Sequence, residues 1–124
     1  MNRFKLLNNV FGWVAFAIAA ATYLSTMEPT ASFWDCGEFI STAYKLDVGH
    51  PPGAPFFMLF GRFFANFAGG PENVAAMINT MSALFSALTI LFLFWSITHL
   101  ARKIVPKDAA NMTTGEVITI LGAG

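Results

Sequence analysis

Two long stretches of this chain carry no charged side chain, and a more polar connection separates them. One uncharged stretch precedes Glu28, and the other lies between Glu72 and Arg102. A helix that crosses about 30 Å of hydrocarbon needs about 20 predominantly apolar residues. The pattern therefore predicts two membrane-spanning helices, at residues 10–27 and 73–101.

The first predicted span has a second interpretation, as a cleaved secretory signal. Arg3 and Lys5 give it a basic start, its apolar core is short, and three alanines at 19–21 resemble a small-residue cleavage site. Trp13 within the core, and the apolar residues that continue past the alanines, favour an anchor that is retained. Cleavage stays an open alternative.

Basic residues near the span ends predict the orientation, because Lys and Arg gather on the cytoplasmic side of a membrane. Five of them flank the two spans: Arg3, Lys5, Arg102, Lys103 and Lys107. We therefore expect residues 1–9 and the loop 102–113 to be cytoplasmic. The connection 28–72 then faces outward, and residues 114–124 begin a third span.

The outward connection is far longer than the usual link between two helices, which indicates that it has structure of its own. Ser32 to Asp35 resemble a capping box, with Asp in place of Glu or Gln, and predict a helix over about 34–46. The proline-rich segment 50–55 predicts a rigid, non-helical link.

A second short helix is predicted beyond this link, because phenylalanines recur there at helical spacing. They are Phe56, Phe60, Phe63, Phe64 and Phe67. Such a stripe suits a helix lying in the outer membrane interface, and it also suits packing against the spans. The two interpretations are compatible, and Gly69-Gly70-Pro71 ends the helix.

Two carboxylates, Asp35 and Glu38, fall on one face of the first connecting helix together with Thr42 and Lys45. They are candidates for the chemistry of this segment. A second interpretation is a solvated helix start, where the helix dipole favours negative charge. The pattern alone leaves both interpretations open.

Composition agrees with a membrane protein and excludes several other classes. The chain is 56% hydrophobic, 15% aromatic and only 11% charged, unlike an average soluble domain. Its formal net charge of zero provides no cationic field to attract nucleic acid. The single cysteine, Cys36, allows no disulfide within the chain and has no companion at the spacing of a zinc site.

Two sequence motifs resemble a known family. The Trp-Asp-x-Gly-Glu-Phe motif at 34–39 and the Gly-His-Pro-Pro-Gly motif at 49–53 are similar to the start of the protein O-mannosyltransferase-like multipass membrane proteins of Bacteroidetes-type bacteria. The resemblance covers essentially the whole chain. It implies an all-α integral membrane protein, the amino-terminal portion of a GT-C glycosyltransferase. Such a protein has a cytoplasmic amino terminus and a large first outer loop.

The resemblance also implies roles for particular residues. Asp35 is implied as the catalytic carboxylate and Glu38 as its companion, while His50 would contact the donor or the acceptor. Lys45 and Arg62 are the cations of the connection that could neutralise a departing phosphate, and Arg62 is the better placed at headgroup depth. The substrate-binding residues expected are Trp34, Lys45, His50 and Arg62.

The implied reaction transfers a hexose, with mannose as the first choice, from a polyprenyl-phosphate carrier to a hydroxyl group of an exported protein. It would take place at the periplasmic face of the inner membrane, and these 124 residues alone are not expected to catalyse it. A divalent metal held by Asp35 and Glu38 is a minor possibility.

Two other functional classes stay open. One is a non-catalytic membrane subunit or assembly module. The other is a transporter with the broken segment near His50 lining a substrate path, although neither span carries an ionisable Asp, Glu, Lys or Arg.

Overall fold

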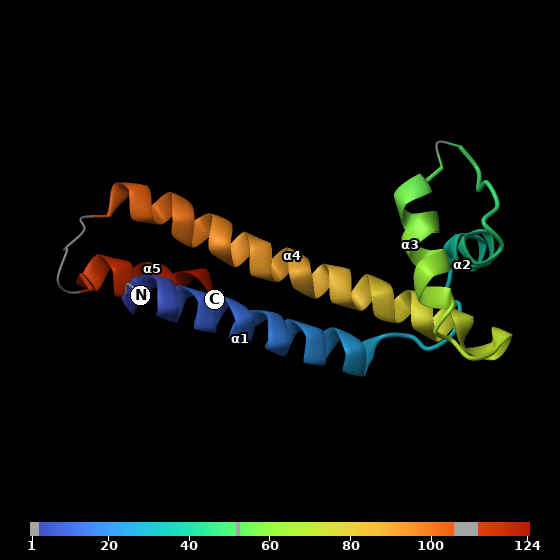
Figure 1. The fold of residues 1–124 in the computed structure, drawn as a ribbon, viewed down its shortest axis with the longest axis horizontal. Helices are drawn as coiled ribbons and strands as arrows, with labels where there is room; N and C mark the ends of the chain where they lie inside the picture. Colours follow the sequence, from blue (N-terminus) through green and yellow to red (C-terminus); the bar gives the residue numbers. More distant parts are fainter. Residues whose placement is uncertain (1–2, 52, 106–111) are drawn as a thin grey trace. The chain divides into compact units, whose positions relative to one another are not determined.

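The computed structural model describes residues 3–51, 53–105 and 112–124, and the regular structure within these ranges is entirely helical (Figure 1). The elements are α1 (Arg3–Thr26), α2 (Cys36–Lys45), α3 (Pro55–Ala65), the 3-10 turn η1 (Pro71–Asn73), α4 (Val74–Ile104) and α5 (Thr114–Ala123). The predicted all-α class is confirmed. Pro52 of the predicted link and Lys107 of the predicted basic flank lie outside the described residues.

Two of the described helices are long and apolar enough to cross a membrane, α1 and the continuous segment Pro71–Ile104. At a rise of about 1.5 Å per residue, the 24 residues of α1 extend about 36 Å and the 31 residues of α4 about 46 Å. Both lengths exceed the hydrocarbon thickness of about 30 Å. The two predicted spans are confirmed as span-length helices.

The described residues form two compact units, and each is considered by itself. The first contains residues 3–23, 86–105 and 112–124. Its buried residues Phe4, Phe94 and Ile120 come from α1, α4 and α5. A Cβ at Gly12 would lie 2.5 Å from Nε1 of Trp95, so α1 approaches α4 closely at this glycine.

An ion pair joins α4 to α5 within the first unit. Arg102 Nε donates to Glu116 Oε1 at 3.0 Å, and the Glu116 side chain is only 3% exposed. Glu116 also forms a capping box with Thr113, since the hydroxyl of Thr113 accepts from the Glu116 N–H and the Thr113 N–H donates back to the carboxylate. The sequence analysis missed this box, although the Thr-x-x-Glu spacing ahead of an apolar run is its usual signal.

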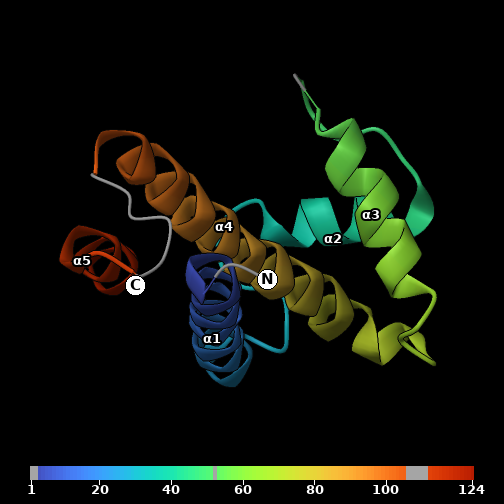
Figure 2. The ribbon, with the colours of Figure 1, turned by 60° about the vertical axis from the view of Figure 1, so that its left-hand side comes forward.

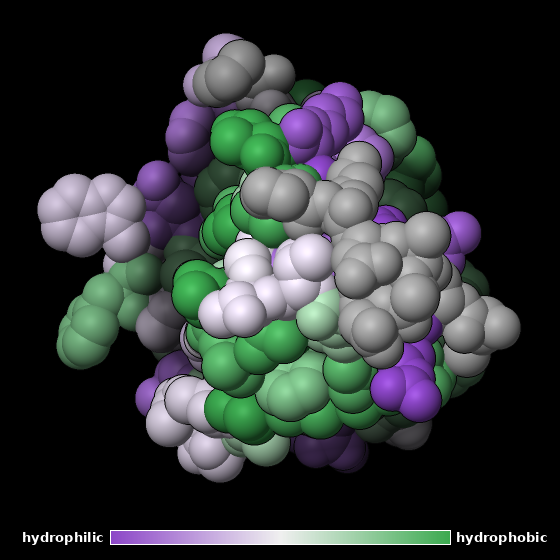
Figure 3. Space-filling view, turned by 90° about the vertical axis from the view of Figure 1, so that its left-hand side faces the viewer, coloured by the Kyte–Doolittle hydropathy of each residue, from purple (hydrophilic) through white to green (hydrophobic). Residues whose placement is uncertain are grey.

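Apolar side chains remain at the surface of the described residues. Figure 3 shows hydrophobic side chains over a large part of the face that is seen. On α1, Trp13, Val14 and Ile18 are all exposed, with Ile18 at 63%. Surfaces of this kind are expected where lipid or further protein replaces water.

The second unit, residues 24–85, contains most of the predicted connection. Helices α2 and α3 pack directly on one another (Figure 2). The contact is close because Gly61 of α3 faces Ala43 of α2, and a Cβ at Gly61 would lie 2.8 Å from the Ala43 Cβ. Met58 and Ile78 complete the core around this crossing.

Three details of the predicted connection are corrected. Helix α2 begins at Cys36 rather than at Trp34, since Trp34 has a φ of 69° and turns the chain before the helix. The expected capping box is wrong: Asp35 is the N-cap and makes no side-chain capping bond, while the Ser32 hydroxyl contacts Cys36 Sγ. Pro55 begins α3 instead of belonging to the link, because the first helical position needs no N–H.

The phenylalanine stripe of α3 has a mixed environment. Phe56 is 77% exposed and Phe63 is 57% exposed, whereas the buried face of the helix consists of Met58, Gly61 and Ala65. Phe60 and Phe64 make edge contacts with Phe85 of α4. Part of the stripe therefore packs on α4, and the rest is an exposed aromatic surface.

Candidate functional site

Asp35 is the N-cap of α2, and its carboxylate makes no capping hydrogen bond. Its backbone carbonyl accepts from the Phe39 N–H at 3.0 Å, which begins the helix. Its φ of −77° and ψ of 0° differ from the extended backbone of a typical N-cap, and the side chain makes no capping bond. The Asp35 side chain is exposed, so its carboxylate is available to a ligand.

Glu38 lies in the first turn of α2 and binds His50 at two points. Glu38 Oε1 accepts from the backbone N–H of His50, and Oε2 lies 2.8 Å from the imidazole Nδ1. The two side chains are 53% exposed for His50 and 39% exposed for Glu38. Both carboxylate oxygens are therefore engaged, and the link after α2 is fastened to the start of the helix.

This contact changes the pKa values of both partners. The hydrogen bond that the ring donates to Glu38, followed by the charge of that carboxylate, raises the pKa of the His50 imidazole, and the charge of Asp35 adds a smaller effect in the same direction. The backbone N–H of His50, followed by its ring, lowers the pKa of Glu38. The contribution of His50 to stability is thus complete below its unfolded pKa of about 6.5 and is lost as the pH rises through the raised value.

The contribution of Glu38 has the opposite pH limit. It is present above the unfolded pKa of a glutamate, about 4.3, and is lost as the pH falls through the lowered value. The charged pair therefore stabilises the segment most between these two limits, in weakly acidic to neutral solution.

We expect the Glu38→Gln substitution to return the pKa of His50 toward its ordinary value, because the neutral amide provides neither the charge nor the same acceptor strength. The measurement is an NMR titration of the His50 ring in detergent micelles. The ring signals of His99 of α4 serve as the internal reference in the same spectra. An unchanged His50 titration in the variant would show that the pair does not form in solution.

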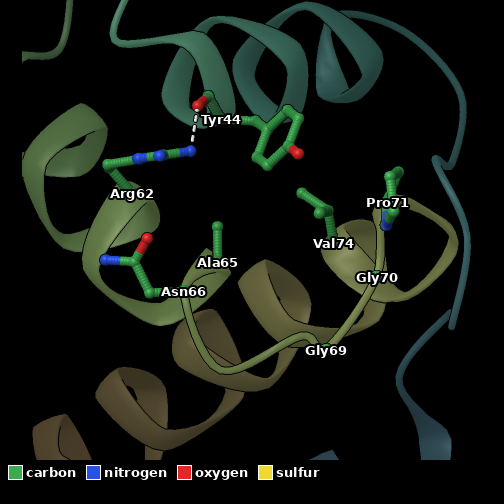
Figure 4. A pocket seen from close by; sticks show the side chains of 8 residues that line it. All are labelled: Tyr44, Arg62, Ala65, Asn66, Gly69, Gly70, Pro71 and Val74. Atoms are coloured by element: carbon green, nitrogen blue, oxygen red, sulfur yellow. Dashed lines mark hydrogen bonds between the residues drawn. The ribbon is translucent and has the colours of Figure 1, made fainter.

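Arg62 of α3 binds the opposite end of α2. Its Nη1 donates to the carbonyl oxygen of Tyr44 at 2.6 Å, and its guanidinium lies 5.3 Å from the centre of the Tyr44 ring (Figure 4). The last carbonyls of a helix have no partner inside it, so a cation there satisfies an acceptor and complements the dipole. A cavity of 340 Å³ lies beside this contact, lined also by Asn66 and the turn 69–71.

The predicted site residues consequently divide between the two ends of α2. Asp35, Glu38 and His50 are gathered at its N-terminal end, whereas Lys45 and Arg62 are at its C-terminal end. The helical rise places Tyr44 about 13 Å along the axis from Asp35. Trp34 precedes Asp35 directly, and its side chain is 94% exposed.

A second, apolar cavity of 340 Å³ adjoins the carboxylate end of α2. Phe39, Ile40 and Phe57 line it together with Ile78 and Asn79 of α4. The Phe39 ring also stands edge-on to the His50 ring, with 6.3 Å between the ring centres. An apolar space therefore lies next to the acidic cluster.

Asn79 is a positioning residue that the sequence analysis missed. Its amide donates to the carbonyl oxygens of Glu28 and Thr30 at 2.7 and 3.0 Å. This ties the segment before Asp35 to α4 across about fifty residues of sequence. The sequence does show Asn79 as an amide within an apolar span, which marks it as unusual. It does not indicate that the amide binds the carbonyl oxygens of Glu28 and Thr30.

The described donor groups do not form a metal site. Among residues 3–51, 53–105 and 112–124, no three His, Cys, Asp or Glu side chains are grouped so that they could hold a metal ion. Both oxygens of Glu38 already bind His50, so the pair Asp35 and Glu38 is a poor fit for a shared ion.

Comparison with known proteins identifies clear similarities. The family described as protein O-mannosyl-transferase TMEM260 N-terminal domain matches residues 35–124. The protein O-mannosyl-transferase TMEM260 of Mus musculus is 34% identical over 87 residues, which is 69% of this chain and 12% of that protein. The protein of the same description from Dictyostelium discoideum is 32% identical over 85 residues, 66% of this chain and 10% of that protein.

The matched relatives are much longer than this chain, which spans about a tenth of their length. No solved structure matches it. The family match begins at Asp35 and includes Glu38, His50 and both ends of α2.

Proposed function

Because the chain belongs to the family of the protein O-mannosyl-transferase TMEM260 N-terminal domain, we propose that it is part of an enzyme that transfers mannose to hydroxyl groups of proteins. Both relatives are named protein O-mannosyl-transferases, and this chain matches only a small part of the length of each. Within this chain, the segment 28–72 is proposed to form part of the active site of that enzyme.

The donor in this proposal is mannose linked to a polyprenyl phosphate. A lipid-linked sugar reaches an enzyme from the membrane, and the segment offers apolar surface for its approach. The cavity beside Phe39 and Phe57 and the exposed part of the α3 phenylalanine stripe support this donor. The basic flanks of the spans support an orientation with this segment on the periplasmic side of the inner membrane.

The observation that carries the catalytic proposal is the difference between the two carboxylates of α2. Glu38 has both oxygens engaged by His50, whereas the carboxylate of Asp35 makes no capping bond and is exposed. Asp35 is therefore the group able to accept a proton from an incoming hydroxyl. Glu38 is a positioning residue, since it acts on the site through His50.

In the proposed step the acceptor oxygen attacks the anomeric carbon while its proton moves to Asp35. The bond between that carbon and the phosphate oxygen breaks, and its electron pair leaves with the polyprenyl phosphate. Attack from the face opposite the leaving group inverts the anomeric configuration. A positioned base contributes about 10²- to 10⁴-fold to such a reaction.

The proposal is tested with membranes that contain the full-length protein and exported acceptor proteins. Polyprenyl-phosphate mannose is supplied in one arm and nucleotide-linked mannose in the other, and hexose on the acceptors is measured by mass spectrometry. We expect transfer from the lipid-linked donor only. If neither donor supports transfer, the enzymatic proposal is overturned and a non-catalytic membrane module is favoured.

A further inference from the structure

We propose that His50 binds the phosphate group of the lipid-linked donor through its imidazole Nε2–H and stabilises the negative charge that develops there. This inference rests on the proposed function and names the contact that the leaving group makes. It assigns the phosphate to the N-terminal end of α2, away from Arg62.

The first argument is geometric. Glu38 holds the imidazole by Nδ1 and holds the backbone of the same residue by its N–H, both at 2.8 Å. An imidazole fixed at Nδ1 by a carboxylate presents Nε2 at its opposite edge. The His50 side chain is about half exposed, so the ring is accessible to a ligand.

The second argument concerns charge. Asp35 and Glu38 place two negative charges at this end of α2, and an anionic phosphate would be repelled by them without a cation. The charged groups that face His50 are Glu38 and Asp35, and both favour its protonated form. The only charge on α3 belongs to Arg62, which is bound to Tyr44 at the other end of α2.

The third argument is the requirement of the leaving group. The donor phosphate is a diester with one negative charge, and it departs as a monoester that carries more. A donor fixed in place before the reaction stabilises such charge effectively, and removal of one donor of this kind costs about 10²- to 10³-fold in rate. His50 donates a hydrogen bond in this step and keeps its proton, while the acceptor proton goes to Asp35.

The test compares two substitutions in the full-length protein. The His50→Asn variant keeps the backbone N–H for Glu38 and offers an amide donor near the Nδ1 position, but it has no cation and nothing at the Nε2 position. The His50→Arg variant keeps a cation that is able to reach both Glu38 and a phosphate. His99→Gln, at the exposed histidine of α4, is the matched control.

We expect mannose transfer by the wild type to fall as the pH rises through the raised pKa of His50. His50→Asn should lose at least about 10²-fold in kcat and lack this pH limb, since no group titrates there. His50→Arg should recover part of the rate and remain active at higher pH. His99→Gln should match the wild type. A wild-type rate and pH profile in His50→Asn would overturn the inference while leaving the transferase function intact.

A binding measurement tests the inference separately from catalysis. The His50 ring signals are followed by NMR in detergent while polyprenyl phosphate is added in one arm and phosphatidylglycerol in the other. A shift with polyprenyl phosphate alone supports the proposed donor contact. A shift with phosphatidylglycerol alone would assign the contact to a membrane headgroup. If neither lipid shifts the His50 signals, the phosphate contact is overturned, whether or not the enzyme transfers mannose.

Discussion

Replacement of Asp35 by Asn in the full-length protein is expected to lower mannose transfer by about 10²- to 10⁴-fold, because the amide cannot accept the proton of the acceptor hydroxyl. The shape of the side chain is retained, and no capping bond is lost since Asp35 makes none. Expression and thermal stability in detergent should therefore equal those of the wild type. The measurement is the initial rate of transfer from the lipid-linked donor at saturating acceptor.

Asp47→Asn is the matched control for this experiment. Asp47 is also exposed, lies in the same segment and is engaged with a neighbouring backbone N–H, that of Val48, at 2.9 Å. We expect the Asp47 variant to retain the wild-type rate. Near wild-type transfer by the Asp35→Asn variant would require the base to come from another part of the protein.

The substitution Gly61→Leu is expected to separate α2 from α3 and to have the largest effect on stability. A single Cβ at this position would already approach the Cβ of the fully buried Ala43 to 2.8 Å, and neither atom can rotate away. Overpacking of a close contact costs about 1–3 kcal/mol, which over most of this range exceeds the gain of about 1 kcal/mol from replacing glycine in a helix. The melting temperature in detergent should fall, and transfer should fall with it.

Gly37→Ala provides the control for helix propensity. An added Cβ at Gly37 would meet only the Cβ of Ala31 at 4.0 Å, an ordinary contact, so this variant should be at least as stable as the wild type. A second comparison combines Gly61→Ala with Ala43→Gly, which moves one methyl group across the same contact. The double variant should have a higher melting temperature than the Gly61→Ala variant. If the Gly61→Leu variant and the wild type have the same melting temperature, then α2 and α3 do not pack together at the contact between Gly61 and Ala43.

The parts of the fold that depend on local pattern could be predicted from the sequence. The absence of charge predicted both long helices. The helix-start signal at 32–35 predicted α2 to within two residues, although the expected capping box is wrong, and the spacing of phenylalanines predicted α3. Their ends were less accurate because single residues decide them. Trp34 adopts a left-handed φ that aromatic residues rarely have, and Pro55 fits inside a helix at its first position only.

The arrangement of the candidate site could not be predicted because it depends on contacts between distant residues. Nothing in the helical spacing indicates that Glu38 turns to His50 instead of pairing with Asp35. The binding of Arg62 to the carbonyl of Tyr44 is equally invisible, since it requires the crossing of α2 and α3. The roles of Asp35, Glu38, His50 and Arg62 stay predictions.

The contact between Glu38 and His50 also implies different tolerance to substitution at its two positions. Half of the contact uses the backbone N–H of residue 50, which every amino acid except proline provides. Exchange of the histidine should thus leave much of the local fold in place, whereas exchange of the glutamate removes both halves at once. In a library that varies both positions, selection for folded protein should constrain position 38, and selection for transfer should constrain position 50.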